Sequence, residues 1–134
     1  MDQNYLLSGN TALELYDEVK NLPIYDYHCH LNPKEIRENR RFNSIGELWL
    51  EGDHYKWRLM RAAGIDERLI TGDAPYEEKF LAFASVLPLA AGNPIYHWAH
   101  MELKTYFNIH EPLNSQSAQN IMDKANLLMS QNAY

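Results

Sequence analysis

One short stretch, residues 23–30, is the only part of this 134-residue chain whose pattern predicts a β-strand. It is rich in β-branched and aromatic side chains, and it lies between Pro23 and the pair Asn32-Pro33. A single short strand cannot be stable alone, because its backbone N–H and C=O groups need partners on a neighbouring strand. The sequence therefore predicts one strand of a larger sheet whose other strands this chain does not contain.

Helices are expected in most of the remaining sequence. The signals are capping residues, proline at the first helical position and apolar side chains at helical spacing. At the helix predicted to follow Ser44, Glu47 stands at the capping-box position, and Gly64 is expected to end the helix capped by Asp53. The expected helices are 11–20, 33–39, 45–50, 54–63, 75–87, 94–107 and a last helix that opens at Asn114 or Ser115.

Composition excludes several classes of protein. Hydrophobic residues make up 46% and charged residues 22%, which is typical of a globular domain and not of a disordered chain. A formal net charge of −6 disfavours nucleic acid as a partner. The longest apolar stretch, residues 80–91, is too short to span a membrane. A single cysteine, Cys29, and an N-terminus without signal-peptide features lead us to expect a cytoplasmic protein.

The pair His28 and His30 is the sharpest chemical feature. On a strand, residues i and i+2 point to the same face, so both imidazoles would project together and could share one divalent metal such as zinc. A catalytic zinc site normally has three protein ligands, so two are an incomplete set. Most isolated His-x-His pairs bind nothing, but barrel enzymes carry catalytic residues at strand ends. Cys29 should point to the opposite side and is interpreted as a small packing residue.

A second candidate lies in residues 52–61, where His54, Arg58 and Arg61 share one face of the predicted helix. With Tyr55, such a face could bind a carboxylate and several hydroxyl groups. A solvated basic face beside acidic neighbours is the simpler interpretation. His97 and His100, three residues apart, could chelate a metal, but their aromatic surroundings favour packing or surface roles.

Two runs of residues are specific: Asp-Tyr-His-Cys-His-Leu-Asn-Pro (26–33) and Gly-Asp-His-Tyr-Lys-Trp-Arg (52–58). Together with several shorter stretches, they resemble the uronate isomerase family of the amidohydrolase superfamily. The order and spacing fit over residues 4–113 and more loosely beyond. The shorter stretches are Asn-Tyr-Leu-Leu (4–7), Thr-Ala (11–12), Ile-Thr-Gly-Asp (70–73), Gly-Asn-Pro (92–94) and Tyr-His-Trp (96–98).

The resemblance implies an α/β fold, a distorted (β/α)8 TIM barrel with a long helical insertion after its first strand. In that scheme residues 1–31 hold the N-terminal helix and first strand, and residues 32–134 belong to the insertion. It also implies the isomerisation of D-glucuronate to D-fructuronate and of D-galacturonate to D-tagaturonate. His28 and His30 match the family's metal ligands, with zinc the expected metal. His54 and Tyr55 match positions that line the sugar-acid site, and Arg58 is an adjacent candidate.

The family's general-base aspartate lies on the last barrel strand and has no counterpart here. We therefore expect this chain to hold the first quarter to third of the enzyme, to be catalytically incomplete alone and to be marginally stable. Its expected partners are a uronate and the rest of the barrel, and the sequence leaves homo-oligomer formation open. Two alternatives remain: a metal-dependent hydrolase of the same superfamily, and a non-catalytic helical interaction module.

Overall fold

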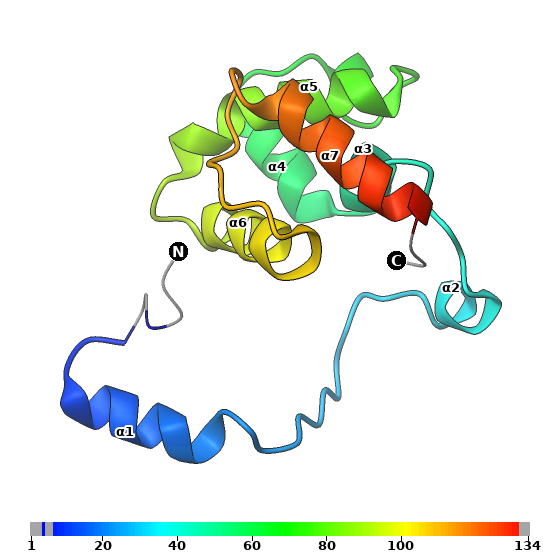
Figure 1. Cartoon of the computed structure of the whole chain (residues 1–134). Helices are drawn as coiled ribbons and strands as arrows, with labels where there is room; N and C mark the ends of the chain where they lie inside the picture. The colour runs from blue at the N-terminus through cyan, green and yellow to red at the C-terminus, as the bar shows by residue number, and fades with distance from the viewer. Residues whose placement is uncertain (1–3, 5–6, 132–134) are drawn as a thin grey trace. The chain divides into compact units, whose positions relative to one another are not determined.

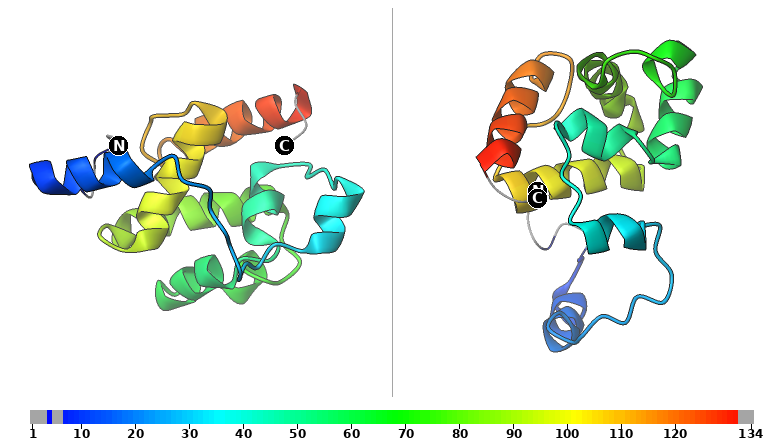
Figure 2. Two further views of the ribbon diagram at one scale, coloured as in Figure 1. Left: turned by 90° about the horizontal axis from the view of Figure 1, so that it is seen from below. Right: turned by 90° about the vertical axis from the view of Figure 1, so that its right-hand side faces the viewer.

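The computed structural model describes residue 4 and residues 7–131, and these fall into two compact units, Met1–Arg40 and Arg41–Tyr134. Within the described residues the regular structure is entirely helical (Figures 1 and 2). No helix in that part of the chain has the length and apolar character needed to cross a membrane. The helices are α1 (Asn10–Val19), α2 (Pro33–Glu38), α3 (Ile45–Leu50), α4 (His54–Ala62), η1 (Glu67–Leu69), α5 (Tyr76–Val86), η2 (Leu87–Ala90), α6 (Pro94–Phe107) and α7 (Ala118–Gln131).

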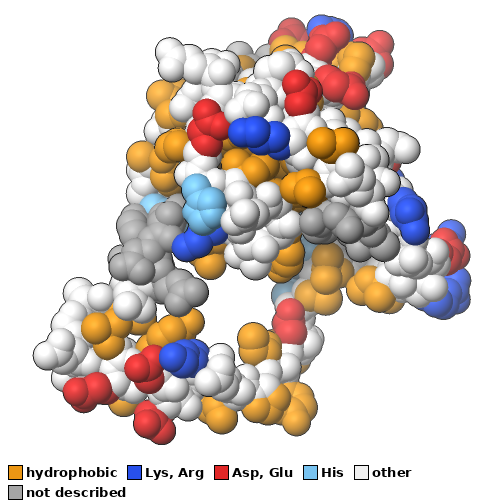
Figure 3. All heavy atoms as spheres, in the orientation of Figure 1, with side chains coloured by type: hydrophobic (Ala, Val, Ile, Leu, Met, Phe, Trp, Pro, Cys, Tyr) orange, Lys and Arg blue, Asp and Glu red, His pale blue; other side chains and the backbone are white. Residues whose placement is uncertain are grey.

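The first unit consists of α1, α2 and the segment between them. Asn32 caps α2 by accepting a hydrogen bond from the Lys34 amide at 3.0 Å, with Pro33 at the first helical position. Asn39 ends the helix in the left-handed conformation. None of the described residues of this unit is buried, and its hydrophobic side chains lie on the surface (Figure 3). As far as its described residues go, the unit therefore has helices but no hydrophobic core.

The predicted strand 23–30 is not formed. The structure assigns no regular secondary structure to these residues, and Ile24, Tyr25 and Tyr27 are 91%, 89% and 100% exposed. The physical reason is the one that made the strand unusual in the sequence: a ladder needs a second strand, and the described residues supply none. The division into units falls after Arg40, whereas the boundary expected for the complete barrel, after residue 31, stays a prediction.

The second unit is a helical bundle with α5 at its centre. Helix α5 packs against α3, α4 and α7, and α6 packs against η2 and α7. Phe80 and Phe83 of α5 are fully buried. The Trp49 ring of α3 packs against both, with centroid separations of 5.9 and 6.1 Å. The Ile45 amide donates to Asn126 Oδ1 at 2.8 Å, which joins α3 to α7. This unit holds the hydrophobic core of the described chain.

Helix boundaries in the second unit follow the sequence closely. Ser44 Oγ accepts a hydrogen bond from the Glu47 amide, and the Glu47 carboxylate reaches back to the Asn43 amide at 2.7 Å. Gly64 follows α4 with a φ of 79°, as expected for a left-handed helix end. The last helix is the exception: residues 115–117 form a turn, Asn114 Oδ1 accepts from amides within it, and α7 begins at Ala118.

Candidate functional site

The imidazole rings of His28 and His30, in the first unit, lie close together. His28 Nε2 and His30 Nε2 lie 3.2 Å apart, and the rings are nearly perpendicular with centroids 5.2 Å apart. The His28 amide donates to Asp26 Oδ1 at 3.1 Å, which ties the backbone at His28 to the side chain two residues earlier. The side-by-side placement expected for positions i and i+2 is thus present although the strand is not.

This separation can be compared with the geometry of a metal site. Two nitrogen ligands bound at about 2.0–2.1 Å to a tetrahedral zinc ion lie about 3.3–3.4 Å apart. The observed 3.2 Å between the Nε2 atoms matches this value within a few tenths of an ångström. The residues present therefore fit two ligands of one metal ion. Among the described residues, however, no group of three His, Cys, Asp or Glu side chains could hold a metal, so the set is incomplete.

Cys29 does not pack as the sequence suggested. Cys29 is exposed, because the described residues contain no sheet that could cover its side chain. The thiol is therefore exposed and not packed.

The first turn of α4, in the second unit, gathers the other predicted site residues. The rings of His54 and Tyr55 lie 4.5 Å apart, and the Arg58 guanidinium lies 5.6 Å from the centre of the Tyr55 ring. Tyr55 is 49% exposed and Arg58 is exposed, whereas His54 is partly buried. The structure thus brings these three side chains together into a polar, cationic and aromatic surface that suits an anionic, hydroxyl-rich ligand.

Arg61, the third member of the predicted basic face, does not join this surface. Its guanidinium forms a two-point ion pair with Glu67, and Thr71 Oγ1 donates to the same carboxylate. The hydrogen bonds from Arg61 and then from Thr71 lower the pKa of Glu67 to about 2. Arg61 therefore links α4 to η1 through this ion pair.

Asp53 begins α4 and has two roles. Its Oδ1 accepts hydrogen bonds from the Tyr55 and Lys56 amides at 2.9 and 3.1 Å, and its Oδ2 accepts from Lys56 Nζ at 2.6 Å. Burial alone would raise the pKa of Asp53, but the charge and hydrogen bonds of Lys56 lower it overall. The same carboxylate therefore caps the helix and forms a partly buried ion pair.

Lys56 is the residue that sequence reasoning missed. It is only 8% exposed, and its ammonium lies 5.3 Å from the centre of the Trp49 ring. Glu102, on α6, is close enough that Lys56 and Asp53 affect its ionisation. Burial is the main cause that raises its pKa, Asp53 adds to the rise, and Lys56 opposes it. The spacing of three residues between Asp53 and Lys56 was a visible signal, but the burial depends on tertiary packing.

His100 of α6 agrees with the packing interpretation. His100 is partly buried, with Nδ1 2.7 Å from the Tyr96 carbonyl and Nε2 2.9 Å from the Leu113 amide. Because the Leu113 N–H can only donate, Nε2 must accept and Nδ1 must carry the proton. His100 is thereby engaged in holding the loop after α6.

Comparison with known proteins gives the class of enzyme to which these features belong. The family model of glucuronate isomerase matches residues 1–134. A uronate isomerase of Caldanaerobacter subterraneus subsp. tengcongensis is 57% identical over 132 residues, and one of Bacillus subtilis (strain 168) is 55% identical over 130 residues. These alignments cover 98% and 96% of this chain but only 28% of each relative. The chain belongs to the glucuronate isomerase family and spans a little over a quarter of the length of these relatives.

Solved structures agree with this assignment. The crystal structure of uronate isomerase from Thermotoga maritima matches 98% of this chain with a TM-score of 0.93 and 40% sequence identity. That of glucuronate isomerase from Caulobacter crescentus matches 99% with a TM-score of 0.88 and 25% identity. The chain covers 29% and 30% of these two structures. Together, the family match and these structures favour the isomerase over the hydrolase alternative.

Proposed function

We propose that this chain is the N-terminal part of a cytoplasmic uronate isomerase that converts D-glucuronate to D-fructuronate and D-galacturonate to D-tagaturonate. The observation that carries the proposal is the glucuronate isomerase family match over residues 1–134. The surface formed by His54, Tyr55 and Arg58 supports it, because it offers hydrogen-bond donors and a cation to a sugar acid. In the complete enzyme, residues 23–30 would become the first strand of a (β/α)8 barrel once neighbouring strands are available.

We further propose that His28 and His30 hold a divalent metal, zinc by preference, through their Nε2 atoms. The support is their separation of 3.2 Å, which fits two positions of a tetrahedral ion. When bound, such a metal would polarise the substrate oxygens at which negative charge develops. The rest of the barrel would supply the remaining ligand and the base that moves a proton between C1 and C2.

The residues of α4 would contribute binding and orientation. Arg58 carries a planar guanidinium that suits a two-point contact with the uronate carboxylate. His54 and Tyr55, held with their rings 4.5 Å apart, offer ring nitrogens and a phenolic hydroxyl to the sugar hydroxyls. Orientation of this kind counts in an isomerisation, because proton transfer requires the acid or base to lie within hydrogen-bond reach of its proton.

A fusion protein tests the proposal directly. In it, this chain replaces the matching first 28% of the Bacillus subtilis relative, and conversion of D-glucuronate to a ketose is measured. We expect turnover by the fusion and none by the 134-residue chain alone. An inactive but folded fusion, or activity on lactones or amides in place of uronates, would contradict the proposal.

A pair of variants tests the metal in the same fusion. The double substitution His28→Ala, His30→Ala should lower kcat by about 100-fold or more, since a metal ion supplies several kcal/mol and each 1.4 kcal/mol is tenfold. It should also remove bound metal, measured by elemental analysis. His110→Ala, an exposed histidine of the loop after α6, is the matched control and should change neither quantity. Unchanged metal content in the double variant would refute the assignment.

A further inference from the structure

The ammonium of Lys56 lies at the junction of three elements. It donates to Asp53 Oδ2 at 2.6 Å, stands 5.3 Å from the Trp49 ring of α3, and acts electrostatically on Glu102 of α6. Its side chain is 10% exposed, whereas that of Asp53 is 31% exposed. A lysine so little exposed is uncommon in proteins, and here it is paired. Its partner, moreover, is the carboxylate that caps the first turn of α4.

Asp53 can hold that turn only if its side chain keeps one orientation. Oδ1 must face the Tyr55 and Lys56 amides, and the ion pair through Oδ2 fixes the rotation of the carboxylate about its bond to Cβ. Without the ammonium, the partly buried carboxylate of Asp53 would lose its counter-charge and turn toward water. The first turn of α4 would then lose its cap, and this is the turn that presents His54 and Tyr55.

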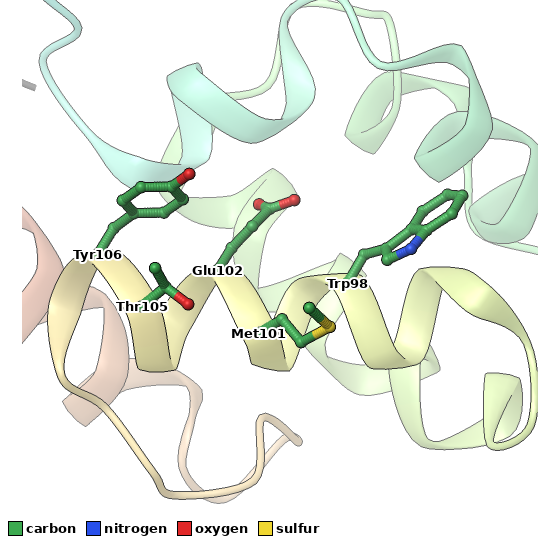
Figure 4. A pocket seen from close by; sticks show the side chains of 5 residues that line it. All are labelled: Trp98, Met101, Glu102, Thr105 and Tyr106. Atoms are coloured by element: carbon green, nitrogen blue, oxygen red, sulfur yellow. The ribbon is translucent and has the colours of Figure 1, made fainter. Parts of the chain in front are cut away.

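Glu102 of α6 interacts electrostatically with both Lys56 and Asp53. Figure 4 shows Trp98, Glu102 and Tyr106 on one side of α6, from successive turns, where with Met101 and Thr105 they line a surface pocket. Glu102 lies between Trp98 and Tyr106 along the helix (Figure 4), and these two aromatic residues are 56% and 61% exposed. Two carboxylates therefore act on Lys56: that of Asp53, which caps its own helix, and that of Glu102 on α6.

We infer that Lys56 is a positioning residue of the uronate site: through Asp53 it holds the first turn of α4 and so fixes the placement of His54 and Tyr55. The inference rests on the proposed function, because it assigns those two side chains to the substrate. Lys56 itself is buried and touches no substrate in this scheme. Loss of its charge should weaken substrate binding more than it slows the chemical step.

Lys79 provides a matched control within the same unit. It is 7% exposed, its Nζ donates to the Gly72 carbonyl at 2.7 Å, and it lies 5.1 Å from the Tyr76 ring. It thus shares the burial and the aromatic neighbour of Lys56, but its partner is a backbone carbonyl and not the cap of α4. If Lys56 only stabilised the fold, substitutions at Lys56 and Lys79 should have equal effects on KM.

The experiment compares three variants of the active fusion enzyme described above. Lys56→Met removes the charge at similar volume, Lys56→Arg keeps the charge, and Lys79→Met repeats the first change at the control site. We expect Lys56→Met to raise KM for D-glucuronate by about 10-fold with a smaller change in kcat, as misplaced binding groups would. Lys56→Arg and Lys79→Met should stay within about twofold of the parent KM. An unchanged KM in Lys56→Met, or an equal rise in Lys79→Met, would overturn the inference.

A measurement on the 134-residue chain separates this inference from the proposed function. If the parent fusion shows no isomerase activity, the proposed function fails, and the nuclear Overhauser contacts between the His54 and Tyr55 rings decide whether Lys56 positions this turn. These contacts should be lost in Lys56→Met and retained in Lys56→Arg and Lys79→Met. Retention in Lys56→Met would refute the positioning role.

Discussion

The helices α1 and α3 show how differently the two units are stabilised. Helix α1 has 10 residues and buries none of them, whereas α3 has 6 residues and buries Ile45, Gly46, Trp49 and Leu50. Helices as short as either are marginal in water when isolated, so most of their stability must come from packing. Local signals are therefore enough to predict both helices, but they do not tell which one is held by a core. In the described chain the second unit has the core, and the first unit carries the histidine pair.

The sharpest test of this contrast is a pair of aromatic truncations. Phe83→Ala removes a fully buried ring from the core of the second unit and should cost about 3–5 kcal/mol of unfolding free energy. Tyr27→Ala removes a fully exposed ring from the first unit and should change it by less than about 0.5 kcal/mol. Denaturant titration followed by circular dichroism measures both. Comparable costs would show that the first unit has a core of its own.

A smaller loss of unfolding free energy is expected from adding a methyl group where two helices of the second unit already lie in close contact. A Cβ added at Gly46 would lie against the backbone carbonyl of Tyr76, where α3 meets α5, while one added at Gly52 would meet nothing within 4 Å. Gly46→Ala should therefore cost about 1–3 kcal/mol through displaced backbone. Gly52→Ala should change stability by less than about 0.5 kcal/mol. Equal thermal midpoints for the two variants would mean that α3 and α5 approach less closely than described.

The third prediction concerns pH and applies to the second unit alone. Burial lowers the pKa of His100 below its ordinary value of 6.5, and its hydrogen bond to the Tyr96 carbonyl offsets part of this. The unfolded chain therefore binds a proton more readily, so stability should fall as pH drops through about 6.5 and level off below the folded pKa. His100→Gln should flatten this dependence, and His110→Gln should not. Thermal melts from pH 8 to pH 5 give the answer, and parallel curves for all three proteins would contradict it.

The smallest effect is expected at Glu102. Burial raises its pKa, with a contribution from Asp53, so the ionised carboxylate is disfavoured in the folded state at neutral pH. Glu102→Gln should raise the thermal midpoint by a few degrees, corresponding to about 0.5 kcal/mol for a domain of this size. The gain should shrink as pH falls toward the folded pKa, where the parent residue becomes neutral as well. A lower midpoint at pH 7 would show that the attraction to Lys56 outweighs the cost of burial.

Sequence patterns predicted those features whose causes are local. Asn32, Ser44 and Asn93 cap the helices that were expected to begin at residues 33, 45 and 94, because a cap depends on a side chain and an amide two or three residues away. The strand failed in this chain because it depends on distant partners. Residue spacing alone predicted that His28 lies beside His30 and that His54 and Arg58 share a helix face. The burial of Lys56 could not be predicted in this way, because it depends on tertiary packing such as that against Trp49 of α3.

The hydrogen bond from the Ile45 amide to Asn126 Oδ1 has a consequence for the time at which the second unit can form. The two residues are 81 positions apart. A ribosome adding about 5–20 residues per second needs roughly 4–16 s to pass from one to the other. During that interval the Ile45 amide lacks Asn126 as its acceptor, and the nascent chain carries its aromatic core residues without α7 to cover them. Synthesis of this segment in the cell therefore includes a period of several seconds in which chaperone binding competes with completion of the bundle.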